Sequence, residues 1–197
     1  MRIFIKALAC SLIVSCVLSL NGFYGACRDI REEVFRLHII ANSDSTEDQE
    51  LKLKVRDRLL EYTNDAFKEC RSKEEAIAAA KANIRNIRSY AQKIVYDSGF
   101  DYTVDAYVTN MNFDTRIYDN LTLPAGEYDA LRIVIGSAGG HNWWCVLFPV
   151  LCIPASTEND LSEVMNKKEE DIVKDSDEYE VGFKIVEVFE FFCSLFG

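Results

Sequence analysis

Two histidines and seven cysteines are the side chains of this 197-residue chain best suited to nucleophilic or metal chemistry. The most enzyme-like combination is Cys145 with His38 or His141, because a thiolate needs a neighbouring base to act as a nucleophile. In an extended segment His141 and Cys145 share a face but lie about 13 Å apart, beyond hydrogen-bond reach. His38 could approach from a neighbouring strand, although a lone histidine in an apolar strand is more often a packed residue. A cell-envelope hydrolase that uses Cys145 with His38 is therefore the alternative to a non-enzymatic role.

The same side chains do not form a recognisable metal site. His38, His141, Cys145 and Cys152 lack the close pairwise spacing of a structural zinc site. The oxygen-rich run at 42–48 resembles part of a calcium loop, but it lacks the regular spacing and central glycine of an EF-hand, so helix capping explains it better. We predict no metal, no cofactor and no catalytic residue.

Cys145 and Cys152 are the cysteines whose spacing suits a disulfide in an exported protein. Their Cα atoms must come within about 7 Å, whereas a straight strand would hold them about 23 Å apart. The chain must therefore reverse near Pro149 for the bond to form. Two buried free thiols are the alternative.

Polar and aromatic residues that suit recognition of a protein partner occur in two segments. The predicted partner-binding residues are Asn42, Asp44, Asp48, His141, Asn142, Trp143 and Trp144. Neighbouring strand residues face opposite ways, so one indole can enter the core while the other meets the far face, and aromatic side chains beside a glycine-rich loop make good anchors. The alternative is that both tryptophans pack beneath helices.

Periodicity predicts the elements that would position these residues. The pattern at 34–41 is typical of a strand, and helical spacing follows at 46–68 and, after the capping box of Ser72 and Glu75, up to Gly99. Strands are then predicted at 102–108, 115–122 and 130–135, and the run at 141–154 should begin as a strand and end as a packed loop. This order indicates an α+β, two-layer domain, with two helices packed on a largely antiparallel sheet.

We predict three parts along the chain. Residues 1–26 form an N-terminal signal peptide or membrane anchor, residues 27–156 form the α+β signalling domain, and residues 157–197 form an acidic tail with a C-terminal amphipathic helix at 181–196. The stretch at 157–180 is expected to be partly disordered or weakly helical. Most of the net charge of −10 lies in the tail, and an acidic surface makes nucleic acid an unsuitable partner.

The first residues have the pattern of an export signal, with Arg2 and Lys6 before an uncharged run at 7–26. These basic residues place the N-terminus in the cytoplasm, and everything from Cys27 onward outside. A cleaved signal and a retained anchor are the favoured alternatives, and a lipid attached to Cys27 or Cys16 is the third.

Three long motifs resemble the stage II sporulation protein R family. Their residues, in chain order, are Arg36–Ser45 with Glu47–Gln49 and Leu51–Asp57, then Leu123–Tyr128 with Ala130–Arg132, then Gly140–Pro149 with Leu151 and Cys152. Val150 and Asp114 stand where the family usually has a proline, which changes loop stiffness, and the tail from Thr157 lies outside the resemblance.

The resemblance implies a signal that is made in the forespore and exported into the space between the two septal membranes. It implies a receptor there, a membrane-embedded aspartic protease that processes an inactive sigma-factor precursor. We therefore expect an exported signalling protein, not an enzyme, that contacts the membrane through its N-terminal segment. The hydrolase and a purely structural envelope protein are the rival hypotheses.

Overall fold

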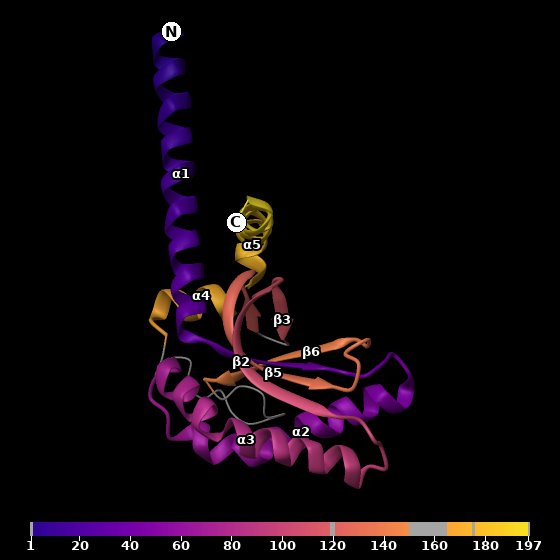
Figure 1. Cartoon of the computed structure of the whole chain (residues 1–197). Helices are drawn as coiled ribbons and strands as arrows, with labels where there is room; N and C mark the ends of the chain where they lie inside the picture. The colour runs from indigo at the N-terminus through magenta and orange to yellow at the C-terminus, as the bar shows by residue number, and fades with distance from the viewer. Residues whose placement is uncertain (1, 119–120, 150–164, 175, 197) are drawn as a thin grey trace. The chain divides into compact units, whose positions relative to one another are not determined.

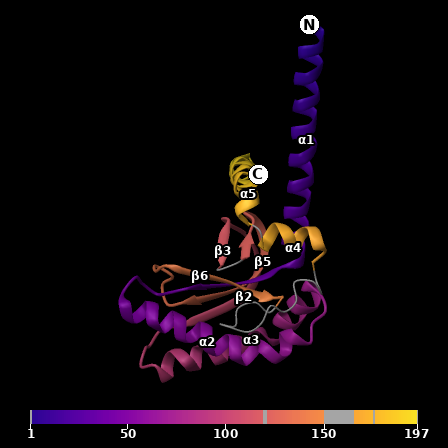
Figure 2. The same cartoon turned by 180° about the vertical axis from the view of Figure 1, so that it is seen from behind.

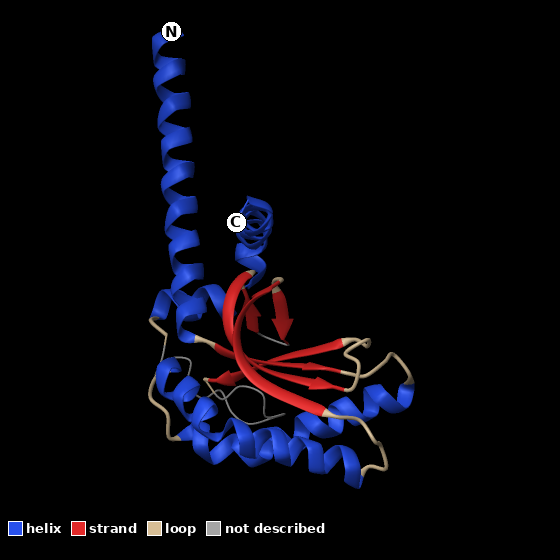
Figure 3. Cartoon of the chain, in the orientation of Figure 1, coloured by secondary structure: helices blue, strands red, loops and turns tan. Residues whose placement is uncertain are grey.

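The computed structural model describes residues 2–118, 121–149, 165–174 and 176–196 (Figure 1). The chain is a mixed helical and β-sheet protein that divides into two compact units (Figure 3). Unit 1 comprises Met1–Glu32, Phe113–Gly126 and Met165–Gly197, and unit 2 comprises Glu33–Asn112 and Glu127–Val164.

Unit 2 is a four-stranded sheet with two helices against one of its faces. Its elements are β1 (Phe35–Ile40), α2 (Thr46–Lys68), α3 (Lys73–Asp97), β2 (Val104–Phe113), β5 (Gly126–Ile135) and β6 (Asn142–Phe148), and the strand order is β2-β5-β1-β6. Helices α2 and α3 lie on the same side of the sheet in two opposite views (Figures 1 and 2). The two helices and the positions of the four strands agree with the sequence-based prediction, although β2 runs beyond its predicted end and β5 begins before its predicted start. The packed loop predicted at the end of 141–154 lies largely outside the described residues.

Helices α2 and α3 begin at the residues that the capping patterns indicated. Ser45 Oγ accepts a hydrogen bond from the backbone N of Asp48 at 3.2 Å, and Ser72 Oγ accepts one from the backbone N of Glu75 at 3.3 Å. The Glu75 carboxylate reaches back to the backbone N of Arg71 at 2.7 Å. These contacts satisfy backbone donors that a helix start leaves unpaired.

The core of unit 2 lies between the helices and the sheet. Its strand residues alternate along β1, β5 and β6, because every second side chain faces the helices. The buried residues of this layer include Leu37, Ile39, Leu51, Val55, Leu59, Ile87, Leu131, Ile133, Cys145 and Leu147. The other face of β1 carries Arg36 and His38, which are also buried.

The sheet is mixed, which differs from the largely antiparallel sheet that we predicted. Strand β1 pairs with β6 in the antiparallel direction, but with β5 in the parallel direction. Every residue of β1 is buried, as is typical of a central strand that is covered on both faces. Its continuous run of buried side chains gives no sign of the direction of its neighbours.

Unit 1 contains α1 (Arg2–Glu33, apart from its last residue), the hairpin β3 (Arg116–Tyr118) and β4 (Leu121–Leu123), α4 (Lys167–Lys174) and α5 (Ser176–Phe196). The strand predicted at 115–122 is thus a two-stranded antiparallel sheet of its own. The predicted C-terminal helix is confirmed as α5, and part of the acidic stretch before it forms α4. In the part of the chain that the structure describes, no helix is both long and apolar enough to cross a membrane.

Candidate partner-binding site

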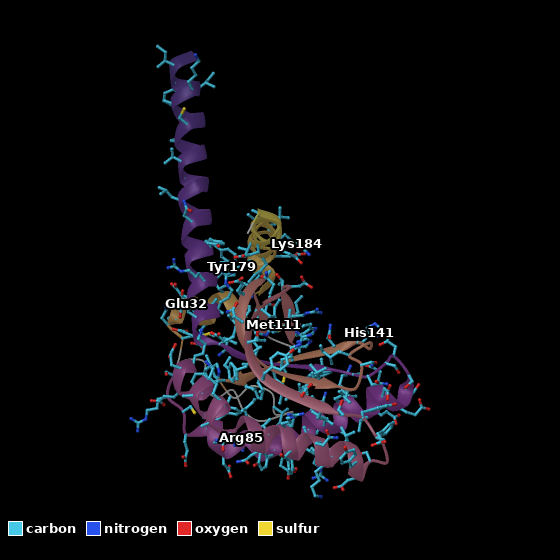
Figure 4. The ribbon with its side chains drawn as sticks, in the orientation of Figure 1. Glu32, Arg85, Met111, His141, Tyr179 and Lys184 are labelled. Atoms are coloured by element: carbon cyan, nitrogen blue, oxygen red, sulfur yellow. The ribbon has the colours of Figure 1, made fainter. Side chains whose placement is uncertain are left out.

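The two segments that carry the predicted partner-binding residues meet at one end of the sheet in unit 2. Strands β1 and β6 are antiparallel neighbours, with Ile40 opposite Asn142. The segment that leaves β1 and begins α2 (residues 42–48) therefore lies beside the loop that enters β6 (residues 137–141). Figure 4 labels His141 in this region, which we call the loop end.

Backbone contacts hold the two loops together. The backbone N of Gly140 donates to the carbonyl of Ala41 at 3.1 Å, and that of Gly139 donates to the carbonyl of Asn42 at 3.0 Å. A Cβ on Gly140 would lie 2.2 Å from the carbonyl oxygen of Ser43, so no larger residue fits there without a backbone shift. The glycine-rich segment therefore permits close approach between the loops.

Asn42 and Asp48 organise the first loop from inside. Asn42 Oδ1 accepts from the backbone N of Ser137 at 3.0 Å, and its Nδ2 donates to Asp48 Oδ2 at 2.9 Å. Ser43 Oγ donates to the same Asp48 oxygen at 2.5 Å. Burial alone would raise the pKa of Asp48, but the hydrogen bonds from Ser43 and Asn42 outweigh it and hold that pKa below its usual value.

Replacing Asp48 with asparagine is expected to lower the free energy of unfolding by about 1–2 kcal/mol. The neutral amide loses charge-assisted hydrogen bonds and a favourable interaction with the N-terminal end of the α2 dipole. Urea unfolding at pH 7 measures the change, with Glu50→Gln as the control because Glu50 is an exposed acid on the same helix. Equal midpoints for Asp48→Asn and Glu50→Gln would show that Asp48 does not hold the loop.

Asp44 and His141 form the accessible tip of the loop end. Asp44 Oδ1 accepts from the backbone N of His141 at 2.6 Å, and it also contacts Nδ1 of the same histidine. The side chains remain 54% and 78% exposed, respectively. The hydrogen bonds from the His141 ring and backbone lower the pKa of the Asp44 carboxyl. An aspartate carboxylate that is hydrogen-bonded to a histidine is therefore presented to solvent.

Lys52 supports the tip from beneath, and sequence reasoning did not select it. Its Nζ donates to the His141 carbonyl at 3.0 Å and to Gln49 Oε1 at 2.5 Å, while Gln49 Nε2 donates to the Ser43 carbonyl at 2.8 Å. Burial lowers the pKa of Lys52. The signal available in the sequence was its place on the buried stripe of α2, one turn after Asp48, where a lysine needs polar partners.

The side chains of Trp143 and Trp144 on β6 point to opposite faces of the sheet. Trp143 lies on the helix side, where the Arg56 guanidinium sits 4.2 Å from its ring centroid. Trp144 stacks on the His38 ring at 3.7 Å, and His38 Nε2 lies 3.0 Å from Asn142 Oδ1. The alternative in which both tryptophans pack beneath the helices is therefore wrong. His38 and Arg56 position the two indoles and were absent from the predicted set.

Cys145 faces away from His38, which contradicts the hydrolase alternative. Leu37 is paired with Cys145, whereas His38 is paired with Trp144, so His38 and Cys145 point to opposite faces of the sheet. Cys145 is buried in the helix-side core and is disulfide-bonded. A thiolate paired with His38 cannot form in this arrangement. Cys152, its predicted disulfide partner, lies outside the described residues, so that pairing stays a prediction.

The loop end offers recognition groups and no metal cluster. Among the residues that the structure describes, no group of three or more histidine, cysteine, aspartate or glutamate side chains could hold a metal ion. What the loop end presents is an exposed carboxylate with an imidazole, beside two half-buried indoles. Such a combination suits contact with a protein surface.

Most of unit 2 is similar in sequence to known sporulation proteins. Residues 31–159 match the family model described as Stage II sporulation protein R (spore_II_R). A curated relative, Stage II sporulation protein R of Bacillus subtilis (strain 168), is 34% identical over 152 residues, which cover 74% of this chain and 68% of the relative. No solved structure matches the chain. The matched range contains both loops of the loop end.

Proposed function

The chain belongs to the stage II sporulation protein R family, and from this premise we propose that it is the exported signalling protein of endospore formation that activates a membrane-embedded aspartic protease. The protease then processes a sigma-factor precursor. The chain acts as a ligand and not as a catalyst. The family match over residues 31–159 is the observation that carries the proposal.

The loop end is the surface that we assign to receptor contact. Its exposed groups, Asp44 and His141, are held by hydrogen bonds that already exist in the free protein. Binding then loses little conformational freedom at these residues, which favours affinity and specificity. The half-buried faces of Trp143 and Trp144 add apolar area beside this charged tip.

The N-terminal segment provides the route to the receptor. Arg2 and Lys6 precede an uncharged run that extends to residue 26, a pattern that directs the rest of the chain across a membrane. Export from the forespore delivers the part of the chain that follows this segment to the space between the two septal membranes. There it meets a protease embedded in the opposing membrane.

Reconstitution in a non-sporulating bacterium tests this function. The chain, the candidate receptor protease and the sigma-factor precursor are produced together, and an immunoblot follows precursor cleavage. We expect cleavage only when all three are present. Val14→Arg with Leu18→Arg, which puts charges into the apolar run, is expected to reduce cleavage several-fold because it blocks export. Cell fractionation then checks that the variant protein stays inside.

Cleavage that is unchanged by the export block would contradict a signal that acts from outside. Absence of cleavage with a folded, exported chain and a receptor shown to be competent would overturn direct activation. Cleavage without the receptor protease would instead assign the proteolysis to another component.

A further inference from the structure

The C-terminal part of α1 is packed against α5 through aromatic rings in unit 1. The Phe23 ring stacks on Tyr179 at 5.5 Å with an interplanar angle of 13°, and it meets the edge of Phe183 at 5.4 Å and 75°. A Cβ on Gly182 would lie 2.8 Å from Phe23 Cε1, so any larger residue there would require the Phe23 ring to move. Figure 4 labels Tyr179 on α5.

A buried ion pair fixes the other side of this contact. Glu190 Oε1 accepts from the Tyr24 hydroxyl at 3.1 Å and lies 3.1 Å from Arg31 Nη2. The Arg31 and Glu190 side chains are only 9% and 16% exposed. Arg31 Nη1 donates to the carbonyl of Ala125 at 2.7 Å, which joins the hairpin region to the same pair. Removing one member of such a pair leaves a buried charge without compensation.

The residues between these anchors are core residues of unit 1. Ala26, Cys27 and Ile30 are buried, and Cys27 is 0% exposed. Gly126 adopts a φ of +136°, and a Cβ there would lie 2.7 Å from Arg31 Nη1. One face of the segment at 23–31 is thus buried, as expected of a structural part of a fold.

We infer that residues 23–31 stay in the exported protein as the docking site for helix α5, so the chain is not cut after Ala26. That cut would remove Phe23, which packs against α5, and Tyr24, which donates a hydrogen bond to Glu190. Attachment of a lipid to Cys27 would require a fully buried sulfur to leave the core. Among the N-terminal alternatives, this packing excludes a cut after Ala26 and a lipid on Cys27, whereas a retained segment or a lipid on Cys16 keeps residues 23–31 in place.

Helix α5 lies outside the matched range of 31–159, as does all of α1 up to residue 30. The contact therefore goes beyond what the family match describes. This inference rests on the proposed function only in assuming that the chain is exported. The consequence is that both chain ends act as one structural element, so truncation at either end should loosen the other.

Intact-mass analysis of the exported full-length chain is the first test. A protease added outside intact protoplasts digests the chain only if it has been exported. This control distinguishes a failure of export from a difference in processing. We expect an exported product whose mass includes residues 23–31. An exported product that begins at Cys27, or a Cys27 that carries a lipid, would overturn the inference.

Hydrogen exchange on the purified full-length chain gives a second test that does not depend on export. Phe23→Ala is expected to raise the exchange rates of α5 amides at least about tenfold, because the helix loses its aromatic contact. Val14→Ala, an exposed apolar position on the same helix, is the matched control and should leave them unchanged. Equal α5 exchange in the wild type and Phe23→Ala would contradict docking, whatever the mass analysis shows.

Discussion

Replacing Asp44 and His141 together with alanine is expected to lower precursor cleavage about thirtyfold while the protein stays folded. Both side chains are exposed, so their pairing contributes little to folding. They nevertheless form the exposed tip of the loop end, where a receptor would gain hydrogen bonds from groups that are already in place. The immunoblot of the reconstituted system measures cleavage, and circular dichroism checks that the midpoint of thermal unfolding moves by no more than about 3 °C.

The matched control is the pair Lys93→Ala with Asp97→Ala. These residues form an exposed ion pair at i,i+4 on α3, with side chains 70% and 61% exposed. Their removal deletes an exposed aspartate and its hydrogen-bonded partner outside the candidate site. Full cleavage with the Asp44 and His141 double variant would exclude the tip as the receptor contact. Equal losses of precursor cleavage in both double variants would point to a general effect of removing exposed polar side chains.

The helices could be predicted from the sequence because their signals are local. Ser45 and Ser72 accept hydrogen bonds from the third residue of the helix that follows, and the apolar stripes on α2 and α3 repeat every three or four residues. Both helices begin where these caps indicated. Strand positions were also readable, since β1, β5 and β6 carry β-branched and aromatic residues.

The parallel pairing of β1 with β5 could not be predicted from such signals. These strands are separated in the chain by two helices and the three strands β2, β3 and β4, so the choice of neighbour depends on long-range packing. Strand β1 is buried on both faces, and a fully buried strand looks the same with parallel or antiparallel partners. The separate sheet of β3 and β4 was missed for a similar reason, because three-residue strands carry little pattern of their own.

The candidate site was predicted in part, by residue type more than by position. Loops that contain polar and aromatic residues at strand ends suit recognition, and that argument selected both segments of the loop end. Their contact follows from the antiparallel pairing of β1 with β6, which places residue 41 beside residue 140. Lys52, Arg56 and His38 were missed because they act through contacts across the fold.

The interior contacts of the loop end bear on how it would bind. Asp48 is buried but accepts from two side chains, and Lys52 donates to a carbonyl of the facing loop. These polar groups beneath the tip are thus hydrogen-bonded within unit 2. A surface supported in this way keeps its shape before a partner arrives, which is the property expected of a ligand that must be recognised after export.

His38 occupies an environment that opposes its protonation. Burial is the main cause of a pKa lowered to about 4, and the nearby Arg132 and Arg36 add to it, although the hydrogen bond with Asn142 acts in the opposite direction. A neutral ring with its proton on Nε2 donates to Asn142 Oδ1. Nδ1 is buried and has no hydrogen-bond partner among the residues that the structure describes, so a second proton would find no acceptor.

Folding stability should therefore fall on acidification, by roughly 3 kcal/mol from His38 alone. The unfolded chain binds a proton near pH 6.5 and the folded chain only near pH 4, so the unfolded state holds more protons between these values and stability rises with pH across that window. Urea unfolding from pH 5 to 6.5 should give His38→Gln a slope smaller than wild type by about 1 kcal/mol per pH unit. Above pH 7.5 the two curves should run parallel, because His38 is then neutral in both states. Equal slopes below pH 6.5 would show that His38 titrates alike in the folded and unfolded chains, and that its burial beside Trp144 does not govern acid stability.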